Sequence, residues 1–265
     1  HLPSEDEQFE AYKEAVETMS GRTVIIRTLD IGGDKEIPYL GLEKEENPFL
    51  GYRAVRYCLA NADMYKTQLR GILRASAFGK IKIMVPLVTC VEEVREVKAL
   101  VEECKKELKS EGVSFDENIE VGCMIETASA SLIADLLAKE ADFFSIGTND
   151  LTQYTMSVDR GNAKVAYLYS AFQPSVLRSI KNIIAAGNAA GIPVGMCGEA
   201  AADPLMIPLL ISFGLDEYSV NPVLVLTARC TISKWTKEEA DALAEKVLSL
   251  STEKEIVAAL KAAAK

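Results

Sequence analysis

The chain has 265 residues, of which 49% are hydrophobic and 26% charged, as in an average globular protein. This length suits either two domains or a single α/β barrel. The 29 basic and 39 acidic residues give a formal charge of −10, which disfavours a basic nucleic-acid-binding surface. No run approaches the roughly 18 apolar residues of a membrane span, and the acidic start does not resemble a signal peptide.

The only histidine is residue 1, which excludes an internal histidine triad, histidine metal cage or phosphohistidine from these 265 residues. Six cysteines are scattered along the chain without a C-x-x-C pair. In a chain of this length, such spacing favours reduced thiols in a cytosolic protein over a disulfide framework. We therefore expect a cytoplasmic protein with neither a nucleic-acid partner nor membrane insertion.

In chain order, Ser4 and Glu7 predict a capping box that opens a helix reaching about Met19. A helix with an apolar stripe at Val91, Val94, Val97, Val101, Cys104 and Leu108 follows in the middle of the chain. Near the end, Thr236 with Glu239 and Thr252 with Glu255 predict two more capped helices. Short apolar runs that predict strands lie at 24–29, 81–86, 119–125, 142–146, 193–197 and 216–220, with a further short strand near 51–53.

Strands that alternate with helices predict a parallel sheet built from βαβ units. No linker-like or low-complexity stretch interrupts the chain, so we expect one continuous domain over residues 1–265. The count of about seven strands is one short of the eight that close a (β/α)8 barrel.

The candidate functional residues lie where strands end, because the functional residues of parallel α/β folds gather there. Glu126 and Asp150 follow successive strands, and neighbouring strands lie under about 5 Å apart. Their carboxylates predict a site for Mg²⁺ or Mn²⁺ made of oxygen ligands. The alternative is that each carboxylate caps the helix that follows it.

Three arginines near strand ends, Arg27, Arg53 and Arg160, predict binding of a small substrate with phosphate or carboxylate groups. Surface salt bridges are the alternative for each, except that Arg27 lies in an apolar run where an unpaired guanidinium would be costly. The glycine-containing stretch after the first strand, residues 30–35, includes Asp34 and Lys35 but matches no known nucleotide-binding pattern.

Cys197 ends a strand between Gly195 and Gly198. A thiol in this place could be a nucleophile or a general acid, and the lack of an internal histidine favours proton donation. The alternative is a small buried apolar residue.

Six long strings closely resemble the C-terminal domain of enzyme I, the family of phosphoenolpyruvate–protein phosphotransferases in bacterial sugar phosphotransferase systems. They are residues 27–35, 46–53, 72–77, 143–154, 158–162 and 195–199. The resemblance implies a TIM-type (β/α)8 barrel that binds phosphoenolpyruvate with Mg²⁺ and forms a homodimer. It also implies roles for single residues: metal ligands Glu126 and Asp150, phosphate or carboxylate contacts Arg27, Arg53 and Arg160, substrate contacts Asn149 and Asp150, and general acid Cys197.

The family's first barrel strand, with a further arginine, and its phospho-accepting histidine domain have no counterpart in these residues. The resemblance therefore implies a fragment that turns phosphoenolpyruvate into pyruvate only with a histidine from a separate N-terminal domain, which then serves the phosphocarrier protein. Residues 127–129, 170–173 and 220–222 depart from the family's usual strings. The alternatives are the C-terminal domain of a pyruvate phosphate dikinase or phosphoenolpyruvate synthase, and a non-catalytic module that senses phosphoenolpyruvate.

Overall fold

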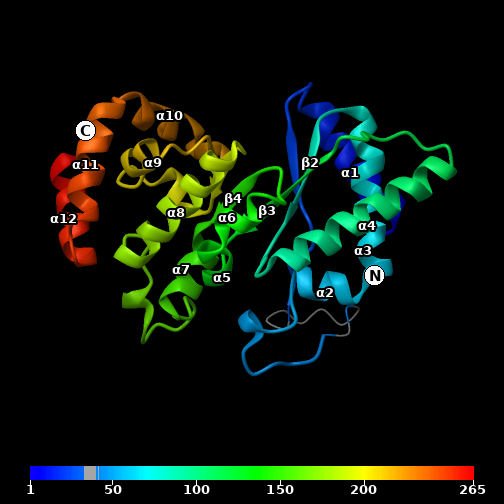
Figure 1. Ribbon diagram of the computed structural model, residues 1–265, viewed down its shortest axis with the longest axis horizontal. Helices are drawn as coiled ribbons and strands as arrows, with labels where there is room; N and C mark the ends of the chain where they lie inside the picture. Colours follow the sequence, from blue (N-terminus) through cyan, green and yellow to red (C-terminus); the bar gives the residue numbers. More distant parts are fainter. Residues whose placement is uncertain (33–39, 41) are drawn as a thin grey trace. The chain divides into compact units, whose positions relative to one another are not determined.

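A computed structural model describes residues 1–32, 40 and 42–265 of the chain (Figure 1). The chain forms two compact units. Unit 1 comprises residues 1–123 and 140–142, and unit 2 comprises residues 124–139 and 143–265. No helix within the described ranges is long and apolar enough to cross a membrane.

Unit 1 contains parallel strands in sequence order, β1 (Val24–Arg27), β2 (Ile81–Val85) and most of β3 (Glu120–Ile125). Val24 pairs with Ile81, and Lys82 pairs with Glu120. Burial alternates along β2, as expected for a strand whose faces differ in exposure. The helices of this unit are α1 (Glu5–Thr18), α2 (Val55–Ala60), α3 (Ala62–Ala75) and α4 (Val91–Ser110), with 3-10 turns η2 (Pro48–Leu50) and η3 (Ser76–Phe78).

Local sequence explains where the helices of unit 1 begin and which face they bury. Ser4 accepts a hydrogen bond from the Glu7 amide and Glu7 accepts one from the Ser4 amide, which confirms the predicted capping box. In α4 the predicted stripe is buried from Val94 to Leu108. Helices α3 and α4 lie side by side in Figure 1, and Arg70 of α3 binds Glu111, just past the end of α4, at 2.7 Å.

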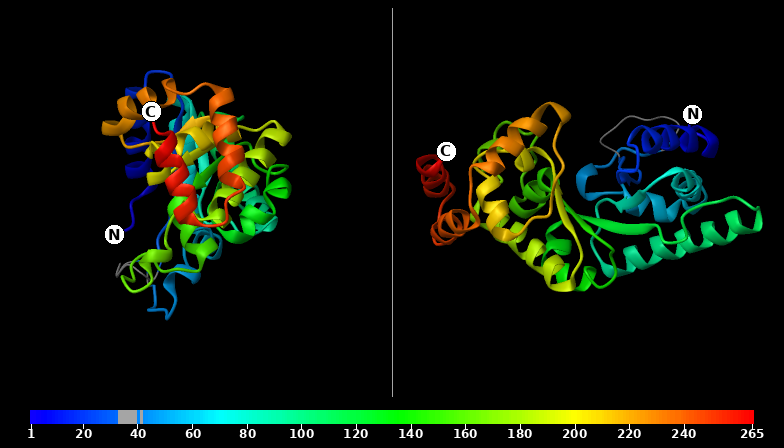
Figure 2. Two further views of the ribbon diagram at one scale, coloured as in Figure 1. Left: turned by 90° about the vertical axis from the view of Figure 1, so that its left-hand side faces the viewer. Right: turned by 90° about the horizontal axis from the view of Figure 1, so that it is seen from above.

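Unit 2 contains a second parallel group in sequence order, β4 (Phe144–Gly147), β5 (Val194–Cys197) and β6 (Glu217–Tyr218). Its longer helices include α7 (Thr148–Met156), α8 (Pro174–Ala190) and α11 (Lys237–Leu248), the last lying beside α12 (Glu253–Ala263) in both figures (Figure 2). The remaining elements are α5 (Ala128–Leu132), α6 (Ala134–Leu137), α9 (Ile207–Phe213), α10 (Val225–Ser233), η4 (Ala166–Leu168), η5 (Glu199–Ala202) and η6 (Pro222–Leu224).

The predicted parallel α/β architecture is confirmed, and the described residues hold six strands instead of seven. The expected strand near 51–53 is wrong. Pro48 starts a 3-10 turn there, and the Glu45 carboxylate accepts a hydrogen bond from the Tyr52 amide at 2.9 Å. These local bonds fold the segment into bends, so its backbone pairs with no strand in the described part of the chain.

Candidate active site

The candidate site of unit 2 lies where β3 and β4 end. Glu126 directly follows β3, and Asp150 lies in the first turn of α7, which begins as soon as β4 ends at Gly147. The positive end of the helix dipole favours a carboxylate at that position. Both acidic residues are buried, with 3% of Glu126 and 7% of Asp150 exposed. Burial of a carboxylate is costly unless the charge is paired or binds a cation, so these two residues are candidates for a functional site.

Gly147 provides the room for the Glu126 side chain. A Cβ atom at position 147 would lie 2.3 Å from Glu126 Oε2, a distance that real contacts do not reach. The Glu126 carboxylate therefore lies against the residue that leads into the Asp150 turn. Any larger residue at position 147 would push this carboxylate away from the end of β4.

The donor set of this unit fits a hard divalent cation. Glu126 and Asp150 supply carboxylate oxygens, and the described residues contain no cluster of three or more histidine, cysteine, aspartate or glutamate side chains suited to a metal. Mg²⁺ commonly takes only one or two protein carboxylates and fills its other positions with water and substrate phosphate. A pair of carboxylates is thus sufficient for Mg²⁺, whereas a structural Zn²⁺ site would need more protein ligands.

Asp150 also forms an ion pair with Arg160 of the predicted arginine set. Its Oδ1 atom lies 3.2 Å from Arg160 Nη1, and the arginine side chain is 40% exposed. The buried Gln153 side chain accepts a hydrogen bond from the Arg160 amide at 3.1 Å. Gln153 thus anchors the backbone of Arg160, and the Arg160 guanidinium reaches solvent. This geometry is suited to an incoming anion.

Tyr169 ties the segment after η4 to the start of α7. Its hydroxyl donates a hydrogen bond to the Asn149 carbonyl oxygen at 3.2 Å. Burial raises the pKa of Tyr169, and a hydrogen bond with Arg160 opposes that rise. Tyr169 therefore contacts the predicted site residue Asn149, although it is 20 positions away in sequence.

Cys197 ends β5 and pairs in register with Gly147 at the end of β4. Its thiol donates a hydrogen bond to the Ile146 carbonyl at 3.6 Å, and the side chain is partly exposed. The structure therefore does not support the alternative of a fully buried apolar filler. Asn149 is close as well, because a Cβ atom at Gly198 would lie 3.4 Å from Asn149 Oδ1.

In unit 1, the other two predicted arginines meet at one carboxylate. Asp30 Oδ2 lies 3.2 Å from Arg27 Nη1, and Asp30 Oδ1 lies 2.7 Å from Arg53 Nη2. The Asp30 side chain is itself buried, so this carboxylate brings the two guanidinium groups together. Arg27 ends β1, and its side chain is half exposed, so the expected cost of burying it inside an apolar strand does not arise. Asp34 and Lys35 lie outside the described residues.

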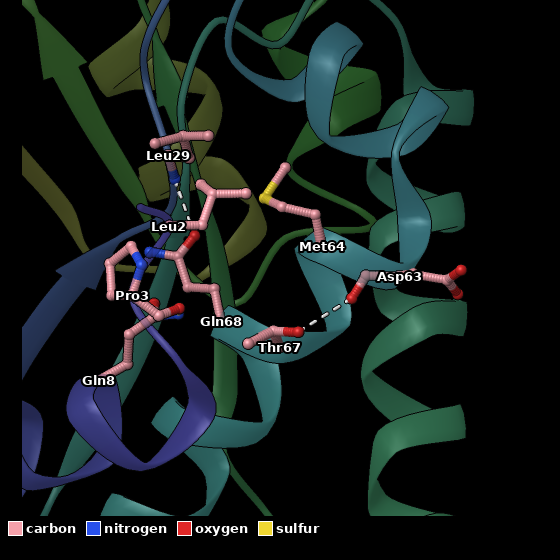
Figure 3. Close-up of a pocket in the computed structure, with 8 residues that line it drawn as sticks. All are labelled: Leu2, Pro3, Gln8, Leu29, Asp63, Met64, Thr67 and Gln68. Carbon is pink, nitrogen blue, oxygen red and sulfur yellow. Dashed lines mark hydrogen bonds between the residues drawn. The ribbon is translucent and has the colours of Figure 1, made fainter. Parts of the chain in front are cut away.

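Unit 1 also has a pocket of about 330 Å³ next to the end of β1 (Figure 3). Leu2 and Pro3 line it from the N-terminal segment, opposite Met64 and Gln68 of α3. Gln68 Oε1 accepts a hydrogen bond from the Leu29 amide at 2.9 Å, which fixes the backbone just after β1. None of the predicted site residues lines this pocket.

Residues 1–237 match the model of a family described as PEP-utilising enzyme, PEP-binding domain. The chain is 54% identical over 260 residues to the phosphoenolpyruvate-protein phosphotransferase of Bacillus subtilis (strain 168), covering 98% of this chain and 46% of that protein. It is equally similar to the protein of that name from Geobacillus stearothermophilus, of which it covers 45%. The chain thus spans less than half the length of these relatives.

Among solved structures, the chain resembles a citrate lyase from Burkholderia xenovorans LB400. The TM-score is 0.49 at 18% identity, and the match covers 75% of this chain and 68% of that chain. A likeness of this degree carries no argument about function.

Proposed function

The chain belongs to the family of PEP-binding domains of PEP-utilising enzymes, and on that premise we propose that it is the phosphoenolpyruvate-binding part of a phosphoenolpyruvate–protein phosphotransferase. The observation that carries this proposal is 54% identity over 98% of the chain to relatives of that name. The strand-end arrangement of acidic, amide, guanidinium and thiol groups supports it, because each of these groups has a use in phosphoryl transfer from an enol phosphate.

The proposed metal ligands are Glu126 and Asp150, and the proposed ion is Mg²⁺. Support comes from the burial of both carboxylates and from their all-oxygen chemistry. When bound, the ion would supply electrostatic stabilisation to phosphoryl and enolate oxygens. Burial strengthens that effect, since charges interact more strongly away from bulk water.

The proposed substrate contacts are the amide of Asn149 and three arginines. Arg160 is partly exposed beside Asp150, so its guanidinium can turn to a phosphate or carboxylate group without leaving its anchored backbone. Arg27 and Arg53 both contact the Asp30 carboxylate, which holds the two guanidinium groups near each other after β1, and such groups bind phosphate and carboxylate oxygens. A local excess of cations is needed for a trianionic substrate, because the chain as a whole carries a formal charge of −10.

In the proposed reaction, a histidine nitrogen from a separate N-terminal domain attacks the phosphorus of phosphoenolpyruvate. The P–N bond forms while the bond between phosphorus and the enol oxygen breaks, and the electron pair remains on the enolate. Cys197 then gives its thiol proton to the terminal enolate carbon, which forms the methyl group of pyruvate. The resulting thiolate takes a proton from water, and in the reverse direction it removes a methyl proton from pyruvate.

This reaction is the first step of a sugar phosphotransferase system. The proposed partners are therefore the N-terminal histidine domain and, through it, the phosphocarrier protein. We also propose a homodimer and an eight-stranded barrel, which would need two strands in addition to the six described here.

The proposed role of Cys197 is tested by replacing it with alanine in the intact protein. Because simple binding does not need a proton donor, Cys197→Ala keeps near-normal affinity for phosphoenolpyruvate in titration calorimetry. The same variant abolishes Mg²⁺-dependent exchange of deuterium into the pyruvate methyl group, measured by NMR. Cys230→Ala, which removes an exposed thiol from α10, is the matched control and leaves both measurements unchanged.

Two results would count against this assignment. Full exchange activity in Cys197→Ala would mean that another group moves the proton. If Cys197→Ala loses both phosphoenolpyruvate binding and exchange, the thiol supports the structure of the site instead of the chemistry.

A further inference from the structure

We infer that Thr148 is a positioning residue for Cys197: its hydroxyl fixes the peptide group after the cysteine and so sets the direction of the thiol. This inference rests on the proposed role of Cys197 as the proton donor. Thr148 is the first residue of α7, and only 2% of its surface is exposed. Its buried hydroxyl faces the end of β5 instead of solvent.

The contact between the two residues is a single well-defined hydrogen bond. Thr148 Oγ1 donates to the Cys197 carbonyl oxygen at 3.0 Å, across 49 positions of sequence. The strand register pairs Gly147 with Cys197. Thr148 directly follows Gly147, so its hydroxyl lies close to the Cys197 carbonyl. The threonine hydroxyl thus holds a carbonyl at the last residue of the strand.

The thiol itself is held to the same stretch of chain. Cys197 Sγ donates to the Ile146 carbonyl oxygen at 3.6 Å. Residues 146 and 148 therefore bind the side chain and the backbone of Cys197, respectively. With both ends anchored, the sulfur has one preferred direction, which is what a proton donor to a single carbon atom requires.

Gly198 gives independent support for the same contact. Its φ angle of +91° lies in the region that favours glycine. A Cβ atom at this position would also lie only 2.4 Å from Thr148 Oγ1. The residue after the cysteine must therefore lack a side chain if the threonine hydroxyl is to reach the Cys197 carbonyl.

The first test is Thr148→Val in the intact protein, which keeps the shape of the side chain and removes the hydroxyl. Exchange at the pyruvate methyl group falls by roughly ten- to a hundredfold, as expected when a reacting group is displaced by a fraction of an ångström. Binding of phosphoenolpyruvate does not involve this proton transfer, so its affinity in Thr148→Val stays within about twofold of the wild-type value. Thr148→Ser restores exchange to near the wild-type rate, because it restores the hydroxyl.

Thr152→Val is the matched control. Thr152 is also buried in α7, and its hydroxyl donates to the Thr148 carbonyl at 2.7 Å, so the variant removes a similar buried hydroxyl without touching Cys197. It keeps the wild-type exchange rate. If Thr152→Val lowers exchange as much as Thr148→Val, the effect is general to the helix and the inference is overturned.

A second measurement needs neither metal nor substrate. Alkylation of Cys197 by iodoacetamide, followed by peptide mass spectrometry, reports how its thiol is held, with the exposed Cys230 as the reference in the same molecule. Thr148→Val speeds alkylation of Cys197 relative to Cys230 by about threefold or more, because a thiol that moves is more accessible. Thr148→Ser keeps the hydroxyl and leaves the relative alkylation rate of Cys197 unchanged.

The two readouts separate this inference from the proposed function. Unchanged exchange in Thr148→Val, in a protein whose exchange depends on Cys197, overturns the positioning role alone. If the wild-type protein exchanges no methyl protons, the proposed function fails. In that case an unchanged alkylation rate in Thr148→Val overturns the positioning role as well, and an increased rate supports it.

Discussion

Individual cysteines of this chain differ sharply in their surroundings. Burial raises the pKa of Cys58, Cys104 and Cys123 to about 12, and the nearby charge of Asp30 adds to the effect at Cys58. These three thiols stay protonated in the folded protein at neutral and mildly alkaline pH. They behave as small apolar core residues, in contrast to the partly exposed Cys197 and the exposed Cys230.

This difference predicts a loss of stability at alkaline pH. Above pH 9, the ordinary pKa of these thiols, the unfolded chain releases protons that the folded chain retains, so the free energy of unfolding falls as pH rises toward 12. At pH 10.5, a fully buried thiol such as Cys123 weakens stability by up to about 2 kcal/mol. Urea unfolding between pH 7.5 and 10.5 measures the slope. Cys123→Ala reduces the slope, whereas Cys230→Ala keeps it, and parallel curves for all three proteins would contradict the prediction.

Helices α11 and α12 begin at the capping residues that the sequence predicts. Thr236 and Thr252 each accept a hydrogen bond from the amide three residues later, and Glu239 and Glu255 bind back to the cap. These interactions confirm the two predicted capping boxes. Each box can be identified from a few adjacent residues, because all of its partners lie within one turn.

The cap of α12 gives a prediction for a single element. Thr252→Ala removes the acceptor for the Glu255 amide and destabilises α12 by about 1 kcal/mol, whereas Thr252→Ser keeps the bond. Amide hydrogen exchange in α12 measures the effect, with α8 as the internal reference. The bonds to Thr252 and to nearby amides lower the pKa of Glu255, so the carboxylate supports the cap above its ordinary pKa and loses that effect as pH falls. Equal protection of α12 in the wild type and Thr252→Ala would refute the assignment of the cap.

The positions of the described strands could be predicted from the sequence, but their ends could not. The apolar runs found every strand of the described chain, but the strands are shorter than the runs, because the ends of a run often continue into turns. The strand predicted around Tyr52 is wrong because its backbone makes local hydrogen bonds instead of sheet bonds. The Glu45 carboxylate and the Pro48 carbonyl accept these bonds. An apolar or aromatic residue indicates burial, and it does not by itself indicate a pairing partner.

Across the whole molecule, the candidate site residues that the sequence reveals most directly lie at the end of a strand or shortly after it. Glu126, Asp150 and Cys197 are of this kind, because a parallel sheet brings the carboxyl ends of its strands to one edge. The resemblance to enzyme I, read from six motifs, is confirmed by the family match and by the relatives.

Thr148, Gln153 and Tyr169 were not found from sequence. Thr148 acts through a bond to a residue 49 positions away, Gln153 through a backbone amide, and Tyr169 through a bond to a residue 20 positions away. No spacing rule anticipates these contacts. The meeting of Arg27 and Arg53 at Asp30 was missed for the same reason, since Arg53 lies 23 positions from Asp30 in sequence.

The proposed phosphoryl transfer depends most on Mg²⁺ that the buried carboxylates of Glu126 and Asp150 hold for phosphoenolpyruvate. Titration calorimetry of the intact protein with phosphoenolpyruvate, with and without Mg²⁺, tests it in the wild type, in Asp150→Ala and in the control Asp241→Asn. Asp241 is an exposed acid on α11, so its loss lowers the negative charge without touching the site. We predict Mg²⁺-dependent binding in the wild type and in Asp241→Asn, and none in Asp150→Ala. Unchanged Mg²⁺-dependent affinity in Asp150→Ala would contradict the account.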